Sequence, residues 1–175
     1  PTRRSSDLNA QEDKPAKTEK VNRIIFLNPA FESEMPISSK TAFSTALGIG
    51  YGGGYPDLTT GGGGFIYVIA PFSDNQFKWF YNLKKRLSKG KIIEKNSGNF
   101  ISLRLTVRGH SIAENVRRTS DFDFAFGPTW GFQRAFKNFH LLFDVGPQYY
   151  FDTKGTGNIF PIVPQINLGY NLIKK

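Results

Sequence analysis

The residues that could carry catalysis are few in this sequence. His110, Ser111 and Glu114 lie close together and would supply the base, the nucleophile and the acid of a hydrolytic triad. Adjacent side chains of a strand point to opposite faces, however, so His110 and Ser111 could act together only in a loop. His140 has no further histidine or carboxylate at a spacing suited to a metal, and the chain has no cysteine. We therefore expect no catalytic residue, no bound metal and no cofactor.

A set of charged residues could form ion pairs rather than a catalytic site. These residues recur at alternate positions of the predicted strands, on the same face as small and polar residues. Such side chains inside a narrow protein interior would be very costly unless they paired with one another. We predict an interior ion-pair network in which Arg104 and Arg108 lie between the carboxylates of neighbouring strands. A polar, porin-like pathway for small ions is the alternative. The predicted network consists of Glu32, Glu34, Lys78, Arg104, Arg108, Asp123 and Asp144.

The alternation of bulky and small side chains predicts the strands that would position these charges. Between residues 41 and 52, Thr, Phe, Leu, Ile and Tyr fall on one parity, and Ala, Ser and Gly on the other. Successive side chains of a strand point to opposite faces, so one face is bulky and the other nearly bare. The same division recurs over 101–108, 122–133, 139–151 and 160–172, and weaker strands over 22–35, 62–71 and 75–84 bring the count to eight. Turn signals between them, such as those at 72–75 and 152–158, indicate an antiparallel up-and-down meander.

Composition agrees with an all-β chain. The sequence has 17 Phe, 7 Tyr and 18 Gly, a balance that favours strands and turns over helices. It has no run of 18 apolar residues that could form a transmembrane helix. The strands of a membrane barrel contain no such run, because their apolar residues alternate with polar ones.

The formal net charge of the chain is +9. Much of this positive excess falls within residues 84–95, and no nucleic-acid recognition motif accompanies it, so we expect no nucleic-acid partner.

Which face of the meander points outward decides the function class. Eight strands close into a lumen just wide enough for side chains to fill, which suits the face of small residues and scattered charges. The aromatic and aliphatic face then suits lipid, and we predict an eight-stranded antiparallel up-and-down transmembrane β-barrel. A soluble or periplasmic lipid-binding barrel, similar to a lipocalin, is the alternative. The predicted lipid-facing residues are Phe43, Leu47, Leu103, Leu105, Phe124, Phe126, Leu141, Phe143, Ile166 and Leu168, and the predicted interfacial aromatics are Tyr51, Trp79, Trp130, Tyr149 and Tyr170.

The first residues differ in style from the rest of the chain. Residues 1–8 resemble translated adapter sequence, and residues 8–13 look like the end of a secretory signal peptide cut near Ala10. We expect residues 11–21 to form a flexible lead-in and residues 22–173 to form the barrel.

Five phrases of the sequence carry a family resemblance: FLNPAFESE at 26–34, FKWFYNLKKR at 77–86, NSGNFISL at 96–103, FGPTWGFQRAF at 126–136 and FDVGPQYYF at 143–151. As a set they resemble the small outer-membrane β-barrel proteins of Gram-negative bacteria, which have the OmpA-like or OmpX-like architecture, and especially an uncharacterised exported group. The resemblance covers residues 22–173, and it implies the cell outer membrane and chain ends on the periplasmic side. The chain departs from the family at its end, where Tyr170 is followed by five residues rather than closing the sequence on an aromatic.

The residues leave more than one role open to such a barrel. A structural or surface-interaction role with a plugged lumen, exerted by a monomer, is the interpretation we favour over a lipid A-modifying enzyme built on His110 and Ser111. The basic residues Lys84, Lys85 and Arg86 form either a solvated loop or a contact for anionic headgroups or cell-wall polymer.

Overall fold

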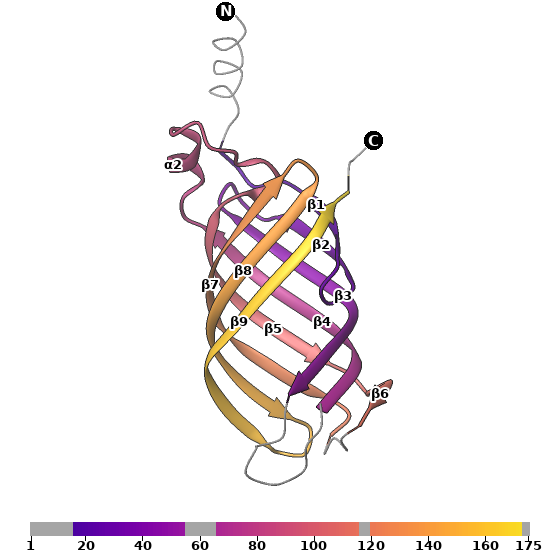
Figure 1. The fold of residues 1–175 in the computed structure, drawn as a ribbon. Coiled ribbons are helices and arrows are strands. Elements are labelled where there is room, and N and C mark those ends of the chain that lie inside the picture. The colour runs from indigo at the N-terminus through magenta and orange to yellow at the C-terminus, as the bar shows by residue number, and fades with distance from the viewer. Residues whose placement is uncertain (1–15, 55–65, 116–119, 173–175) are drawn as a thin grey trace, which may run out of the picture.

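The computed structural model describes residues 16–54, 66–115 and 120–172 (Figure 1). Within them the protein is all-β, with nine antiparallel strands in one sheet. The predictions for residues 1–10 and for most of the lead-in lie outside these residues. The strands are β1 (Val21–Ile25), β2 (Ala30–Pro36), β3 (Thr41–Gly54), β4 (Ile66–Phe80), β5 (Asn99–Arg108), β6 (Ala113–Glu114), β7 (Asp123–Phe136), β8 (Phe139–Asp152) and β9 (Gly157–Asn171).

Eight of these strands pair in a ring. The sheet runs in the order β3-β2-β1-β9-β8-β7-β5-β4, and a further pairing between β3 and β4 brings its two ends together. The short strand β6 lies outside the ring and pairs with β4 at Val68 and Ile69. The strands are tilted, and β1 begins at the same end of the ring at which β9 ends (Figure 1).

Three of the predicted strands are wrong, but the errors cancel, so that the total number of strands in the ring is unchanged. The strand predicted over 22–35 is a hairpin, in which β1 and β2 pair across a turn at residues 26–29. Two separate strands were predicted over 62–71 and 75–84. In the described residues a single strand, β4, replaces them and runs without interruption through the predicted turn at 72–75. The ring therefore has the expected eight strands with different boundaries.

Contacts made by neighbouring strands explain why β4 does not stop at its polar residues. Asp74 accepts two hydrogen bonds from Arg104 of β5, at 2.9 and 2.8 Å. Asn75, on the other face, accepts a hydrogen bond from Thr45 of β3 at 2.8 Å and donates one to Ser73. A polar run is typical of a turn, but partners from both flanking strands allow this one to stay extended.

The connection from β4 to β5 covers the end of the ring at which β1 starts. It contains a short helix, α2 (Leu83–Leu87), and a 3-10 turn, η2 (Glu94–Asn96). Lys95 and Asn96 both have left-handed backbone angles, with φ of 54° and 58°, which turns the Asn96 side chain into the interior. Thr18 and Glu19, in the described part of the predicted flexible lead-in, are hydrogen-bonded to Ser38 and to the side chain of Asn96. This part of the lead-in is therefore fixed against the ring.

Candidate functional site

The interior nearest the chain ends holds a cluster of four fully or almost fully buried charges, Arg23, Glu32, Glu34 and Lys78. The Arg23 guanidinium lies 3.0 Å from Glu32 and 3.1 Å from Glu34. The Lys78 ammonium lies 2.9 Å from Glu34 and 3.6 Å from Glu32. Two cations and two carboxylates thus balance one another, and each charge has two partners of opposite sign.

Neutral groups complete the coordination of these charges. Asn96 and Gln133 both donate to the Glu34 carboxylate, the latter at 3.1 Å. Arg23 donates to the Asn171 side chain at 3.0 Å and to the Lys95 carbonyl at 3.2 Å. Buried ions are tolerated only when their remaining hydrogen-bonding capacity is met, and this cluster meets that condition.

The register of the strands explains how these side chains meet. Arg23 and Glu32 are direct partners across the β1–β2 pair. Glu34 and Lys78 belong to strands separated by β3, which contributes only the small side chains of Ala42 and Ser44 at this level. The small residues leave room for the longer charged side chains of β2 and β4 to meet over them.

An apolar cluster lies beside these charges, at the end of the ring covered by the β4–β5 connection. Phe80 and Phe100 are fully buried and pack edge to face, with ring centroids 5.7 Å apart. The Lys78 ammonium lies over the Phe100 ring, 5.4 Å from its centroid. The cluster consists of Ala42, Phe80, Leu83, Ile93, Phe100 and Leu142, and it closes this end of the interior.

A second set of charges lies further along the ring. Arg104 makes a two-pronged contact to Asp74, and one of its nitrogens lies 3.8 Å from Asp144. Gln165 donates to Asp74 at 2.9 Å, and Gln76 donates to Asp144 at 3.0 Å. Four strands, β4, β5, β8 and β9, therefore contribute to one polar cluster.

Not every interior polar atom is satisfied within the described residues. Both ring nitrogens of His140, the Oδ1 atom of Asp144, the Oε1 atom of Gln76 and the side-chain amide of Gln148 are buried without a protein hydrogen-bond partner. Burying a polar atom without a hydrogen-bond partner is unfavourable, so each of these atoms lowers the stability of the fold.

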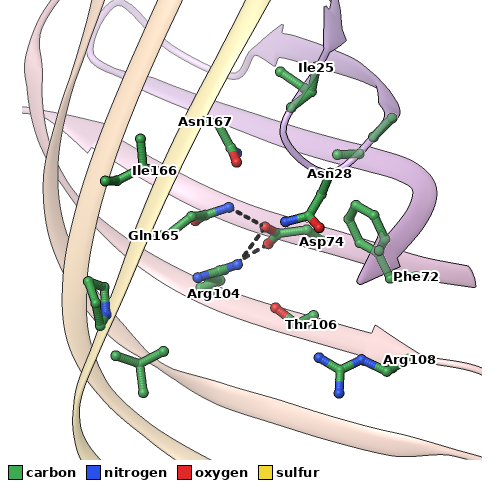
Figure 2. A pocket seen from close by; sticks show the side chains of 15 residues that line it. Ile25, Asn28, Phe72, Asp74, Arg104, Thr106, Arg108, Gln165, Ile166 and Asn167 are labelled. Atoms are coloured by element: carbon green, nitrogen blue, oxygen red, sulfur yellow. Dashed lines mark hydrogen bonds and ion pairs between the residues drawn. The ribbon is translucent and has the colours of Figure 1, made fainter. Parts of the chain in front are cut away.

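A half-open cavity of about 250 Å³ adjoins the second set of charges. Figure 2 shows Asp74 joined to Arg104 and Gln165, with Phe72, Thr106 and Arg108 further along the cavity. The Arg108 side chain is 42% exposed and lies 3.8 Å from Asp123. Arg108 therefore lies at the rim of the interior. The cavity is lined by Ile25, Asn28, Ala30, Ala46, Gly50, Phe72, Asp74, Arg104, Thr106, Arg108, Val163, Pro164, Gln165, Ile166 and Asn167.

The structure places all seven residues of the predicted network inside the ring and in ion pairs. They do not form one continuous network: Glu32, Glu34 and Lys78 belong to the first cluster, Arg104 and Asp144 to the second, and Arg108 pairs with Asp123 at the rim.

Sequence reasoning missed Arg23 and Asp74. In the single strand predicted over 22–35, Arg23 has the opposite parity to Glu32, and only the turn at 26–29 brings both to one face. Asp74 falls in the predicted turn at 72–75, which the structure replaces with continuous strand.

The ten predicted lipid-facing residues lie on the outward parity of their strands. Phe43, Leu47, Leu103, Phe126, Ile166 and Leu168 are exposed, whereas Leu105, Phe124, Leu141 and Phe143 are half-buried by neighbours on the same face. Phe124, for instance, stacks on Phe151 at 4.9 Å between ring centroids.

Four of the five predicted interfacial aromatics have described side chains, and these four also point away from the interior. Trp79, Trp130 and Tyr149 are exposed, and Tyr170 is half-buried. The Trp130 indole donates to the hydroxyl of Tyr81 at 2.9 Å, and Asn138 donates to the hydroxyl of Tyr170. The side chain of Tyr51 lies outside the described residues.

The residues considered for catalysis and metal binding lie apart from the interior charges, except for His140. His110 contacts Asp121 at 2.8 Å, and both side chains are largely exposed. Glu114 lies in β6 and is exposed. Among the described residues, no group of three or more His, Cys, Asp or Glu side chains could hold a metal ion.

The predicted basic contact lies on and beside α2. Lys84 and Lys85 are exposed, whereas Arg86 donates to the Ile92 carbonyl at 2.8 Å. Partial burial lowers the pKa of Arg86 from its usual value. Arg86 therefore closes the loop, and the two lysines are the cations presented outward.

Comparison with known proteins gives no match for this chain among family models, curated proteins or solved structures. Among the described residues, no helix has the length and apolarity that spanning a bilayer would require.

Proposed function

We propose that this protein is a β-barrel of the outer membrane of a Gram-negative bacterium, acting as a structural or surface-interaction protein without enzymatic activity. The observation that carries the proposal is the inverted polarity of the ring: ion pairs and amides occupy its interior, and Phe, Trp, Leu and Ile side chains cover its exterior. In water, exposing apolar surface costs roughly 25 cal/mol per Å², whereas hydrocarbon removes that cost. The same inversion argues against the soluble lipid-binding alternative, which needs an apolar interior.

The exterior supports this proposal in its details. Leu47 is 61% exposed and Leu103 is 48% exposed, although both lie within long strands rather than in loops. The outward polar residues of the neighbouring strands bond to one another: Ser33 donates to Asn22 at 3.0 Å, and Thr45 donates to Asn75 at 2.8 Å. Mutual bonding lowers the cost of placing such groups against lipid.

The interior supports a plugged lumen rather than an open pore. The apolar cluster around Phe80 and Phe100 and the charges around Glu34 fill the ring at the end where β1 starts. Eight strands leave little open lumen even without such filling. We expect no steady, large conductance from the purified chain in planar bilayers, and regular open channels of high conductance would contradict the plug.

Lys84 and Lys85 support a contact with an anionic partner, either lipid headgroups or cell-wall polymer. Each lysine near an anionic membrane surface contributes about 1 kcal/mol. We expect Lys84→Gln combined with Lys85→Gln to weaken co-sedimentation with anionic polymer or vesicles at low salt. Unchanged co-sedimentation would assign the two lysines to a solvated loop.

The two native tryptophans offer a direct test of the membrane proposal. Trp79 and Trp130 are the only tryptophans of the chain, and they are 45% and 44% exposed on the outer face. Reconstituted in vesicles, their fluorescence should be quenched by lipids brominated on the acyl chains and should be protected from iodide in the water.

Two matched variants assign the signal. Trp79→Phe and Trp130→Phe each leave one reporter, and each remaining tryptophan should respond to brominated lipid. A chain that stays monodisperse in buffer without detergent, and whose tryptophans are quenched by iodide but not by brominated lipid, would overturn the proposal and favour the soluble alternative.

A further inference from the structure

In the described part of the ring, a long interruption of the strand pairing lies between β9 and β3. On β9, pairing to β1 covers only residues 169–171, followed by a hydrogen bond from the Phe26 amide to the Leu168 carbonyl. On β3, pairing to β2 ends at Gly48, followed by a hydrogen bond from the Ile49 amide to the Pro29 carbonyl. Beyond these points, within the described residues, each strand is paired on one side only, β9 with β8 and β3 with β4.

The cavity lies between these two unpaired edges. Its lining includes residues 163–167 from the edge of β9, Gly50 from the edge of β3 and Asn28 from the turn between β1 and β2. The inward-facing side chains on this side, such as Gln165 and Asn167, are half-buried, whereas inward residues near the chain ends are fully buried. The cavity, which is half-open, therefore borders the part of the wall in which β1 and β2 do not join β9 to β3.

Proline makes the β9 edge a poor partner for another strand. The Leu168 carbonyl points to the open side, because it accepts the Phe26 amide. The main-chain groups of Ile166 and Pro164 point the same way, since alternate residues of a strand face the same neighbour. Pro164 has no amide hydrogen to donate there, so an added strand would lose a hydrogen bond at this position. The geometry thus disfavours a peptide strand as the occupant of the opening.

The lining is amphipathic, and its two cations are Arg104 and Arg108. Arg104 is matched by its bidentate contact to Asp74, whereas Arg108 at the rim lies 3.8 Å from Asp123 and is 42% exposed, so its guanidinium is accessible to a further anion. Apolar side chains of Phe72, Val163 and Pro164 line the walls next to it. A guanidinium beside an apolar wall fits a carboxylate or phosphate head followed by a hydrocarbon chain.

We propose that this lateral cavity binds a single-chain anionic amphiphile, which reaches it from the bilayer through the opening between β9 and β3. The head lies at Arg108, and the hydrocarbon chain lies along Phe72, Val163 and Pro164. This inference rests on the proposed function, because the opening faces lipid only if the outer face of the ring does.

Photolabelling in vesicles tests the site. The probe is palmitate carrying a diazirine on its chain, which is activated by light and located by peptide mass spectrometry. Labels should concentrate on residues 163–167 and Phe72, above an even background over outward residues such as Leu103. Unlabelled palmitate and lysophosphatidate should compete, and the better competitor identifies a carboxylate or a phosphate head. Decanol, which is neutral, should not compete.

Two variants should reduce the labelling, and a third should not. Arg108→Gln removes the cation at the rim and should weaken palmitate binding about tenfold, the value of one charge-assisted hydrogen bond. Ala46→Trp should fill the cavity and remove the specific labels. Lys40→Gln removes one exposed positive charge from the turn between β2 and β3, away from the cavity, and is the matched control. If Ala46→Trp does not fold, Arg108→Gln still decides the question.

The outcomes separate the cavity from the membrane proposal. Labels spread evenly over the outer face, with no change in Arg108→Gln, would overturn the site even if brominated lipid quenches both tryptophans. Labels on residues 163–167 in detergent-free buffer, together with tryptophans that brominated lipid does not quench, would keep the site and overturn the membrane proposal. Competition by decanol as strong as by palmitate would overturn the anionic head.

Discussion

Glu34 is the residue whose replacement tests the interior charges most sharply. Its fully buried carboxylate lies 3.1 Å from Arg23 and 2.9 Å from Lys78, and it also accepts hydrogen bonds from Asn96 and Gln133. Glu34→Gln keeps the size of the side chain and removes its charge. Arg23 and Lys78 would then share the single carboxylate of Glu32, leaving one buried positive charge without a counterion.

The expected cost is large because none of these charges reaches water. Removing one partner from a buried ion pair typically lowers the free energy of unfolding by about 3–5 kcal/mol. Arg108→Gln is the internal control, since its pair with Asp123 spans 3.8 Å and its side chain is 42% exposed. An exposed pair of this kind contributes about 0–1 kcal/mol.

A double replacement distinguishes charge imbalance from general damage. Glu34→Gln with Lys78→Met leaves Arg23 and Glu32, which again balance at 3.0 Å. The double variant should therefore be more stable than the sum of the single effects predicts, by about 1–3 kcal/mol.

Urea unfolding in one fixed lipid or detergent, followed by the fluorescence of the two native tryptophans, measures all four variants. The reasoning is refuted if Glu34→Gln costs no more than Arg108→Gln. It is equally refuted if the effects of Glu34→Gln and Lys78→Met simply add.

Four further predictions address the outer face, the close strand contacts, the apolar cluster and the unpartnered histidine. Leu103→Arg on the outer face should cost about 2–4 kcal/mol in vesicle unfolding if it lies near the bilayer midplane, and an unchanged stability would count against lipid contact. Gly131→Val should abolish folding, read by the yield of heat-resistant protein on gels, because a Cβ there would lie 2.4 Å from the Phe143 carbonyl oxygen; normal yield would contradict the close approach of β7 and β8. Phe100→Ala should cost about 3–5 kcal/mol in the same urea titration, and a loss below 1 kcal/mol would show that the apolar cluster is loosely packed. His140→Leu should be nearly neutral or stabilising by that titration, because neither ring nitrogen has a protein partner among the described residues, and a loss above about 2 kcal/mol would reveal an interaction of the imidazole.

The alternation of side chains was enough to predict much of the fold. It indicated the all-β class, five of the strands of the ring and the inward direction of the seven charged residues, because the period of two in a strand is a local property. The strands predicted over 22–35, 62–71 and 75–84 were wrong. The division at residues 41–52, for example, is reproduced by the buried Ala42 and Ser44 and the exposed Phe43 and Leu47 of β3. The family resemblance, the membrane and the partners remain predictions.

The boundaries of the strands and the partners of the charges were decided by tertiary structure. A polar run such as 72–75 is typical of a turn until Arg104 and Thr45 supply its hydrogen bonds from neighbouring strands. Arg23 joins Glu32 and Glu34 only because the turn at 26–29 reverses the chain and changes the parity of the residues after it. The same short hairpin leaves one edge of β3 and one edge of β9 without a partner strand beyond it in the described residues, and the cavity lies beside these edges. Within each uninterrupted strand, the sequence by itself determined which side chains share a face, a matter of local backbone geometry. Only the closed ring decided which of those side chains meet, because their contacts join residues far apart in the chain.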